Sequence, residues 1–350
     1  MSWPSFWIHN NWQTKILGPL SKLVCWEAQR RYNRYLTAKS TSTQPRQSEA
    51  TVIVVGNLVV GGTGKTPFIV WLVDQLKNQG FKVAILSRGY GVKKVRSPII
   101  VDACSNPSDA GDEPVMLAQQ TGCTVVVFPK RSEAIEKLQK MDEFDFIISD
   151  DGLQHFALQR DIEVVMIDAE RQFGNGFCLP AGPLREPLTR LQDVDFTVWN
   201  GLSKKAPIPR FEQIQRAPYR MQLNPKRFHS LVNPGKSLSP DEFFTKYKEQ
   251  GLYAIAGIGN PERFFNTLID LGFKLKTQAF SDHYDYEVND FDDLLKDGIK
   301  PLVMTQKDAV KCSLFVKPHQ DWWYLEVATE CSAQIVESVV GFHQQRQALK

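Results

Sequence analysis

The chain has 350 residues, 42% of them hydrophobic and 23% charged, with a formal net charge of +3. This length and composition describe a globular protein with a real core and room for two domains, and the small net charge does not indicate a nucleic-acid-binding protein. None of the six cysteines has the spacing of a C-x-x-C pair or of a metal site with histidine, so we expect reduced thiols.

Aromatic side chains and positive charge are concentrated at the N-terminus. Residues 1–50 carry seven Lys or Arg against two Glu, a net charge of +5, so the other 300 residues sum to −2. Ile16, Leu20, Leu23 and Val24 recur at helical spacing, which predicts a helix with one apolar face. The aromatic residues of this segment are Trp3, Phe6, Trp7, Trp12, Trp26, Tyr32 and Tyr35.

This segment is neither a secretory signal nor a membrane span. It lacks a small-residue cleavage site, and its longest apolar part is about half the roughly 20 residues that a span needs. Aromatic rings and Lys or Arg favour the membrane interface and an anionic leaflet. We therefore predict a helix that lies in the interface, and the alternative is an amphipathic helix packed on the protein's own core.

Apolar runs alternate with helical patterns from residue 51 to about 200. Runs without polar alternation suit strands that are buried on both faces of a parallel sheet. Residues 67–80 and 131–141 have the pattern of crossover helices, which predicts an α/β fold of the P-loop NTPase type with helices on both faces. The expected strands are 51–56, 82–87, 98–101, 124–128, 144–149, 162–168 and 195–199.

The composition of the sequence changes after residue 205. Residues 206–236 are rich in proline and basic residues and contain strand-like pieces, which predicts a β-type linker. A smaller C-terminal α/β domain is expected over 237–350, with a final helix from about residue 330. The predicted domains are thus 1–50, with a polar connector at its end, then 51–205, 206–236 and 237–350.

A glycine-rich stretch, NLVVGGTGKTPF at 57–68, follows the first predicted strand. Its Gly64-Lys65-Thr66 matches the end of the phosphate-loop motif G-x-x-x-x-G-K-[ST], but Val59 stands where the motif has its first glycine. Lys65 is expected to reach the β- and γ-phosphates and Thr66 to hold Mg²⁺. The alternative is a glycine-rich turn with a chance match. The predicted nucleotide site comprises Gly61, Gly62, Thr63, Gly64, Lys65 and Thr66.

Two further patterns carry charge that could serve phosphoryl transfer. Asp150 and Asp151 end an apolar strand, as in a Walker B motif, which predicts Mg²⁺ binding; a turn rich in Asp and Gly is the alternative. Arg185 and Glu186 lie in a proline-bounded loop, where the arginine could bind a phosphate or simply a carboxylate.

Two acidic motifs have ordinary structural explanations. Pro114 suits the first turn of a helix, so Asp112 or Glu113 is expected as its cap. His283 stands beside Asp282, and a single histidine in such a motif is usually structural or solvated.

In their order and number these motifs resemble the tetraacyldisaccharide 4′-kinases of Gram-negative bacteria, a family that also lacks the first P-loop glycine. The resemblance implies ATP- and Mg²⁺-dependent phosphorylation of the 4′-hydroxyl of a tetraacylated glucosamine disaccharide 1-phosphate, which gives lipid IVA. It also implies peripheral or monotopic attachment to the cytoplasmic face of the bacterial inner membrane, where the glycolipid lies, and we expect a monomer. The matching series from about residue 50 to 312 is GNLVVGGTGKTP, SRGYG, GDEP, SDDGLQH, FGNGFCLPAGPLREP, AGIGNPERF, SDHYDY and TQKDAVK.

The resemblance also assigns roles to particular residues. It implies that Asp112 takes the proton from the hydroxyl, that His283 is its partner, and that Lys65 serves the phosphates. Because His283 lies in the second predicted domain, a cleft that closes on ATP is expected. Further positions implied to line the site are Glu113, His155, Arg185 and Glu186, while Arg88 and Tyr90 are implied to face the glycolipid.

The chain departs from the family pattern at two places. Gln306 stands where the family usually has Glu, and Phe156-Ala157 replaces a common basic pair, which puts a substrate-phosphate contact in doubt. Two other classes of protein remain as alternatives. A membrane-associated partitioning ATPase would have a lysine before the paired glycines, where this chain has Val60, and a soluble small-molecule kinase would not need the N-terminal helix.

Overall fold

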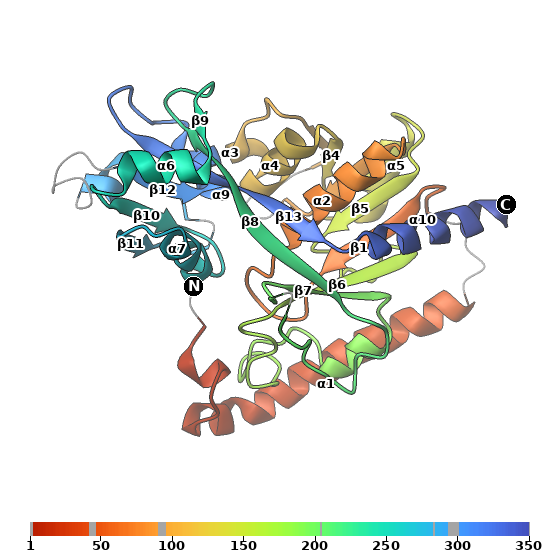
Figure 1. The fold of residues 1–350 in the computed structure, drawn as a ribbon. Helices are drawn as coiled ribbons and strands as arrows, with labels where there is room; N and C mark the ends of the chain where they lie inside the picture. The colour runs from red at the N-terminus through yellow and green to blue at the C-terminus, as the bar shows by residue number, and fades with distance from the viewer. Residues whose placement is uncertain are drawn as a thin grey trace. The chain divides into compact units, whose positions relative to one another are not determined.

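The computed structural model describes residues 3–41, 47–89, 96–203, 205–282, 284–292 and 301–349. The chain forms two compact units. The larger consists of Trp3–Gln222 and Thr329–Lys350, and the smaller is essentially Leu223–Ala328. Figure 1 shows the elements of both.

The larger unit is built on a mostly parallel sheet. Its strands run in the order β7-β6-β1-β5-β2-β4-β3, and within this order only the β3–β4 pair is antiparallel. β1 lies between β5 and β6, and all three are buried along their whole length because their residues are almost all apolar. The bounds are β1 Thr51–Gly56, β2 Val83–Ser87, β3 Ile99–Val101, β4 Thr124–Val127, β5 Phe146–Asp150, β6 Ile162–Asp168 and β7 Phe196–Asn200.

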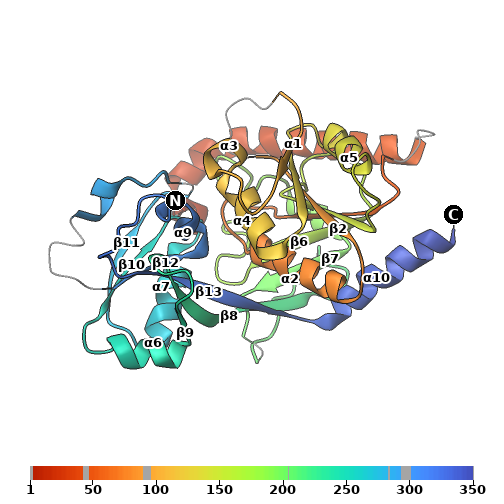
Figure 2. The same ribbon diagram turned by 90° about the horizontal axis from the view of Figure 1, so that it is seen from above.

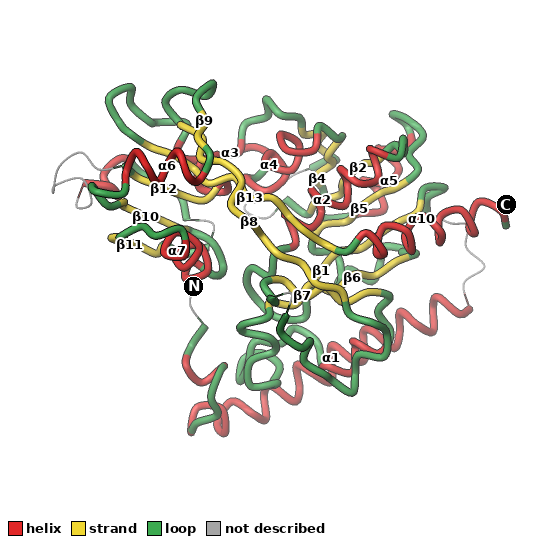
Figure 3. The backbone as a smooth tube through the Cα atoms, in the orientation of Figure 1, coloured by secondary structure: helices red, strands yellow, loops and turns green. Residues whose placement is uncertain are grey.

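Helices cover both faces of this sheet, as the sequence predicts (Figure 2). Side chains of α5 and of the N-terminal helix pack against one face of the sheet. α2 packs against the sheet as well, and it contacts α4 and α10. Between β6 and β7 the chain is mostly loop, interrupted by the short η2 (Figure 3). The bounds are α2 Lys65–Asn78, α3 Pro107–Ala110, α4 Asp112–Thr121, α5 Arg131–Gln139, η2 Leu188–Gln192 and α10 Ala333–Ala348.

In the smaller unit parallel strands run in the order β11-β10-β12-β13. Two clusters of buried apolar and aromatic side chains pack around these strands. Its elements are β9 Ser237–Leu238, α6 Pro240–Tyr247, β10 Leu252–Ala256, α7 Pro261–Asp270, β11 Leu275–Ala279, η3 Val288–Phe291, β12 Leu302–Thr305 and α9 Gln306–Cys312.

The units are divided differently from the predicted domains. β8 (Tyr219–Ser230) and β13 (Trp322–Cys331) each have residues in both units, so no separate linker over 206–236 is seen. α10 belongs to the larger unit, because His343 hydrogen-bonds Thr51 at 2.8 Å and stacks near Phe146. The sequence signal for a final helix was clear, but its packing partner lies almost 300 residues away.

The N-terminal helix α1 (Trp12–Thr41) follows a short turn, η1 (Ser5–Trp7), and is longer than the predicted apolar segment. Its small residues Thr14, Gly18 and Ser21 are buried against the protein. Ser21 donates to the carbonyl of Cys178 at 2.7 Å. Among the described residues, no helix is both long and apolar enough to cross a bilayer.

The opposite face of α1 carries its large apolar side chains. Trp12 and Ile16 are each 67% exposed, Trp26 is 59% exposed and Leu23 58%. A helix that packs only on its own protein's core would bury its large apolar residues. Val24 and Cys25 of α1 do pack against the core, so α1 has one side packed on the protein and another that leaves large apolar side chains exposed.

Tyr32 and Tyr35 of α1 pack on side chains from elsewhere in the larger unit. Tyr32 covers the guanidinium of Arg190 at 4.1 Å, and Arg190 pairs with Glu163 of β6 at 2.5 Å. Tyr35 stacks on Phe156 with ring centroids 5.4 Å apart. Phe156, one of the expected departures from the family pattern, thus packs against α1.

Candidate active site

The glycine-rich loop joins the carboxyl end of β1 to the start of α2, the setting that a phosphate loop requires. Gly61 and Gly64 have φ values of +99° and +91°, which favour glycine. A Cβ added to Gly64 would lie 2.1 Å from the side-chain amide of Asn200. The loop therefore needs a glycine at position 64 for both conformational and steric reasons.

The structure explains why valine stands in place of the first glycine. Val59 is buried in the core and forms an antiparallel bridge with Leu184. The Val60 N–H donates to Pro183 at 3.0 Å, and the Arg185 N–H donates to Leu58 at 2.7 Å. This part of the loop is strand-like, where a β-branched residue fits well.

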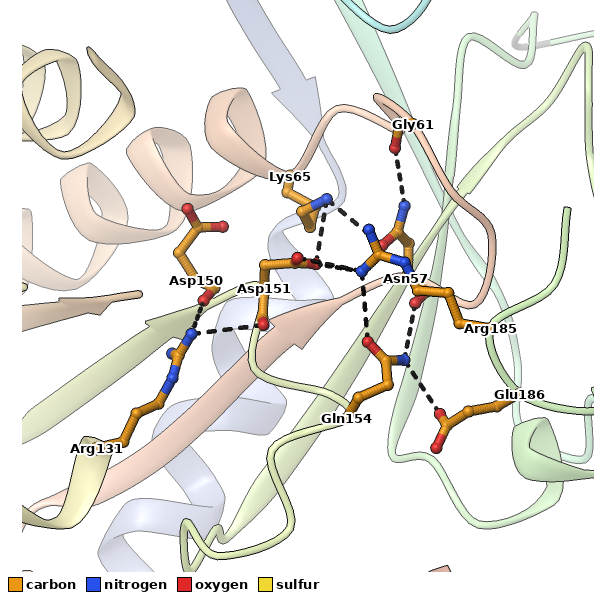
Figure 4. A network of polar contacts seen from close by, with 9 residues as sticks. All are labelled: Asn57, Gly61, Lys65, Arg131, Asp150, Asp151, Gln154, Arg185 and Glu186. Atoms are coloured by element: carbon orange, nitrogen blue, oxygen red, sulfur yellow. Dashed lines mark hydrogen bonds and ion pairs between the residues drawn. The ribbon is translucent and has the colours of Figure 1, made fainter. Parts of the chain in front are cut away.

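Lys65 and Arg185 hold the carboxylate of Asp151 between them (Figure 4). The Lys65 Nζ lies 3.4 Å from one oxygen, and the Arg185 Nη1 lies 3.2 and 3.1 Å from the two. Burial alone would raise the pKa of Asp151, but the two cations outweigh it and hold that pKa well below its usual range. A permanent negative charge therefore balances the cations of the loop.

Gln154 and Asn57 extend this network (Figure 4). The Gln154 amide donates to the Asn57 carbonyl at 3.2 Å and to Glu186 at 3.1 Å, and the Asn57 side chain accepts from Lys65 at 3.4 Å. Burial raises the pKa of Glu186. Sequence reasoning did not select Gln154 or Asn57, although both stand in the quoted motifs SDDGLQH and GNLVVGG.

Arg131, at the start of α5, hydrogen-bonds the backbone carbonyls of both aspartates. Its guanidinium is buried and donates to the carbonyl of Asp150 at 2.7 Å, to that of Asp151 at 3.4 Å and to the Ser149 hydroxyl. Burial lowers its pKa to about 10, so it stays charged at neutral pH. Asp151 has a φ of 45°, unusual for a residue other than glycine, and this clamp helps to hold it.

Asp150 ends β5 as a buried carboxylate. Its Oδ1 has no hydrogen-bond partner among the described residues. Burial, followed by the charge of Glu113, raises the pKa of Asp150 to about 7. A buried carboxylate oxygen suits the coordination of a cation. Among the described residues, no Lys or Arg side chain donates a hydrogen bond to this oxygen.

The described residues contain no group of three or more His, Cys, Asp or Glu side chains that could hold a metal ion. Mg²⁺ bound with a nucleotide takes one or two carboxylates and completes its shell with phosphates and water. The unpartnered Oδ1 of Asp150 fits such a ligand; Asp151 follows it in the chain, and Thr66 stands in the first turn of α2.

Asp112 and Glu113 open α4 but do not cap it through their side chains. The cap position is held by Gly111 with a φ of 92°, so the expected Asp112 or Glu113 cap is wrong. Both acids lie in the first helical turn, where the helix dipole favours negative charge. Asp112 is only 7% exposed. The charge of Glu113 raises the pKa of Asp150, which indicates that this end of α4 lies near Asp150.

Arg88 is one of three arginines whose charge acts on the pKa of His155. Burial, with Arg131, Arg160 and Arg88, lowers the pKa of His155 to about 4, so the imidazole is neutral at pH 7. Arg88 follows β2 and is exposed. The predicted site residues Tyr90 and His283 lie outside the described residues.

The fold and this cluster define a P-loop phosphotransferase: a glycine loop on a central parallel strand, a lysine at its helix and aspartates ending the neighbouring strand. The sequence profile of the family described as tetraacyldisaccharide-1-P 4′-kinase matches residues 13–342. The chain belongs to the tetraacyldisaccharide 4′-kinase family and is thus an enzyme of the kinase class.

Similar proteins match along nearly the whole chain. A tetraacyldisaccharide 4′-kinase of Hydrogenovibrio crunogenus is 46% identical over 98% of this chain and 97% of its own. One from Haemophilus influenzae is 44% identical over 95% and 92%. The crystal structure of LpxK from Aquifex aeolicus in complex with ATP is 26% identical, with a TM-score of 0.74 over 94% of this chain and 99% of that one.

Proposed function

We propose that this chain transfers the γ-phosphoryl group of ATP to the 4′-hydroxyl of a tetraacyldisaccharide 1-phosphate, which gives lipid IVA in lipid A biosynthesis. The observation that carries the proposal is the joining of Lys65, Arg185 and Asp151 at the carboxyl end of the parallel sheet. Brought together beside a glycine loop, these groups suit a reaction in which negative charge moves between phosphate oxygens.

Nucleotide binding would use the backbone of the glycine loop. The N–H groups of residues 61–66 and the start of α2 favour the phosphates, and Lys65 would exchange its contact with Asp151 for a phosphate oxygen. Thr66, Asp150 and Asp151 would hold Mg²⁺, which when bound would neutralise charge that develops on the phosphates. Lys65 and Arg185 add positive charge that is already in place before the nucleotide arrives.

Asp112 is proposed as the base that takes the proton of the acceptor hydroxyl, with His283 as its partner. Its support is the family motif together with its burial at the start of a helix that approaches Asp150. A buried carboxylate near the phosphates can accept a proton from an otherwise poor nucleophile. The remaining residues proposed for the site, as substrate or supporting residues, are Arg88, Tyr90, Glu113, His155, Arg185 and Glu186.

A matched pair of variants tests this base. Asp112→Asn is expected to cut turnover by about two orders of magnitude, within the range for loss of a general base. Asp109→Asn, which changes an exposed aspartate three residues earlier, is the control and should leave turnover intact. His283→Ala and the exposed His319→Ala form the corresponding pair in the smaller unit. Near-normal rates for Asp112→Asn and His283→Ala would remove the base from the mechanism.

The exposed apolar face of α1 supports attachment to the cytoplasmic face of the inner membrane. An acyl chain leaves a bilayer at a cost of about 0.8 kcal/mol per CH₂, so the enzyme gains by working at the surface. Trp12, Ile16, Leu23 and Trp26 would enter the interface, and Arg30 and Arg34 of the same helix would favour anionic lipids.

The reaction itself is tested with the full chain in detergent micelles. Labelled ATP is supplied with and without tetraacyldisaccharide 1-phosphate, and the lipid product is resolved by thin-layer chromatography. Acceptor-dependent labelling of the lipid supports the proposal. Hydrolysis of ATP that is unchanged by the acceptor, with no labelled lipid, would favour an ATPase instead.

A further inference from the structure

Four successive carbonyls of the glycine loop each accept a hydrogen bond from a side chain. Three donors come from distant parts of the chain, and the fourth, Asn57, stands at the start of the glycine-rich stretch itself. The pairs are Trp3 Nε1 to Val60 at 3.1 Å, Asn57 Nδ2 to Gly61 at 3.0 Å, Arg171 Nη2 to Gly62 at 2.6 Å and Asn200 Nδ2 to Thr63 at 3.1 Å.

These bonds fix the direction in which the loop presents its backbone. A phosphate loop must aim its N–H groups at the ligand, so its carbonyls turn away and need other donors. A carbonyl left without a donor in a part-buried site costs free energy, and a loop with free carbonyls could turn its peptide planes. Satisfied carbonyls hold the amides in place before the nucleotide binds.

Two of the four donors support each other. The Arg171 guanidinium lies 5.0 Å from the centre of the Trp3 ring, a cation–π contact, while each side chain donates to its own loop carbonyl. Arg171 also lies 3.9 Å from Asp168 at the end of β6. The Trp3–Arg171 pair therefore ties the loop both to the sheet and to the N-terminal segment.

The segment that carries Trp3 is itself anchored. The Trp7 Nε1 donates to Pro180 at 2.9 Å, and the Asn175 N–H donates to the Trp7 carbonyl at 2.7 Å. Trp3 and Trp7 meet edge to face with centroids 6.2 Å apart. Trp7 is thus half-buried and held by these two hydrogen bonds, and the exposed apolar side chains begin at Ile8 and Trp12.

We propose that Trp3 is a positioning residue for ATP, acting with Arg171 through the carbonyls of Val60 and Gly62. The inference rests on the proposed kinase function and adds that the segment leading into α1 sets the affinity of the phosphate loop for nucleotide. The N-terminal segment then has a part in binding the nucleotide, in addition to any part in membrane attachment.

The test compares Trp3→Phe with Trp7→Phe in the full chain in detergent micelles. Both variants lose one indole N–H from the same segment, but only the first loses a donor to the glycine loop. ATP affinity is measured by titration calorimetry, acceptor KM by the kinase assay, and loop order by hydrogen exchange of amides 60–64. We expect Trp3→Phe to weaken ATP binding about three- to tenfold, the range for one lost hydrogen bond, and to speed exchange of these amides.

Trp7→Phe should leave ATP affinity within about twofold of the parent, and acceptor KM should change little in either variant. Arg171→Met should weaken ATP binding in the same direction as Trp3→Phe. Unchanged ATP affinity in Trp3→Phe, or an equal loss in Trp7→Phe, would overturn the inference while leaving the kinase intact. A parent protein that fails to bind ATP would overturn the proposed function and the inference together.

Discussion

Replacing Ile16 and Leu23 of α1 by serine removes two apolar side chains that are 67% and 58% exposed. Full burial of such a side chain is worth about 1.5–3 kcal/mol. Scaled by these exposures, each contributes about 1–2 kcal/mol to entry into a membrane interface, and the two together about 2–4 kcal/mol. Since 1.4 kcal/mol is a factor of ten, the partition coefficient should fall about 30- to 700-fold.

Flotation with vesicles that contain anionic phospholipid measures this partition directly. Leu314→Ser is a matched control, because Leu314 is 68% exposed but lies outside α1. Neither α1 substitution touches the buried Thr14–Gly18–Ser21 face, so the melting temperature should hold. Undiminished binding of the double variant, or an equal loss in Leu314→Ser, would refute the assignment of this face to the membrane. Trp7 is unsuitable for the test, because its indole N–H donates a hydrogen bond to the Pro180 carbonyl.

Three further predictions concern the larger unit. Gly64→Ala should abolish measurable ATP binding, because its Cβ would meet Asn200 and its φ is +91°; calorimetry with a folded variant decides this. The lowered pKa of His155, about 4 against about 6.5 when unfolded, means that stability is full above pH 6.5 and is lost as the pH falls towards 4. Discounted for its partial exposure, the loss is about 1–2 kcal/mol, and His155→Gln should remove it from denaturant titrations. Glu163→Gln should lower the free energy of unfolding by about 3–5 kcal/mol, since Arg190 would stay buried without its carboxylate; a loss under 1 kcal/mol would contradict this.

The strands of the larger unit could be predicted almost to the residue, because runs such as 51–56 and 162–168 are apolar without interruption. The division into units could not. β8 and β13 cross from one unit to the other, and their burial changes along their length, so neither shows a single periodicity.

The motifs predict which residues form the site, but they do not reveal how the glycine loop is held. Trp3 and Val60 are 57 residues apart, Arg171 and Gly62 are 109 apart, and Asn200 and Thr63 are 137 apart. No local pattern links such pairs. The role of Val59 was equally hidden, since its bridge partner lies in the proline-bounded loop.

The smaller unit is an insertion, because the chain leaves the larger unit after Gln222 and returns at Thr329. During synthesis, the larger unit therefore stays incomplete until α10 has left the ribosome, although residues 3–222 of that unit are synthesised before the smaller unit. Arg346 of α10 reaches Asp161 at 3.2 Å and the Ser48 carbonyl at 2.8 Å, next to the start of β1. Removing α10 should consequently destabilise the start of β1, which is synthesised early. The inserted smaller unit could fold before the larger unit is complete.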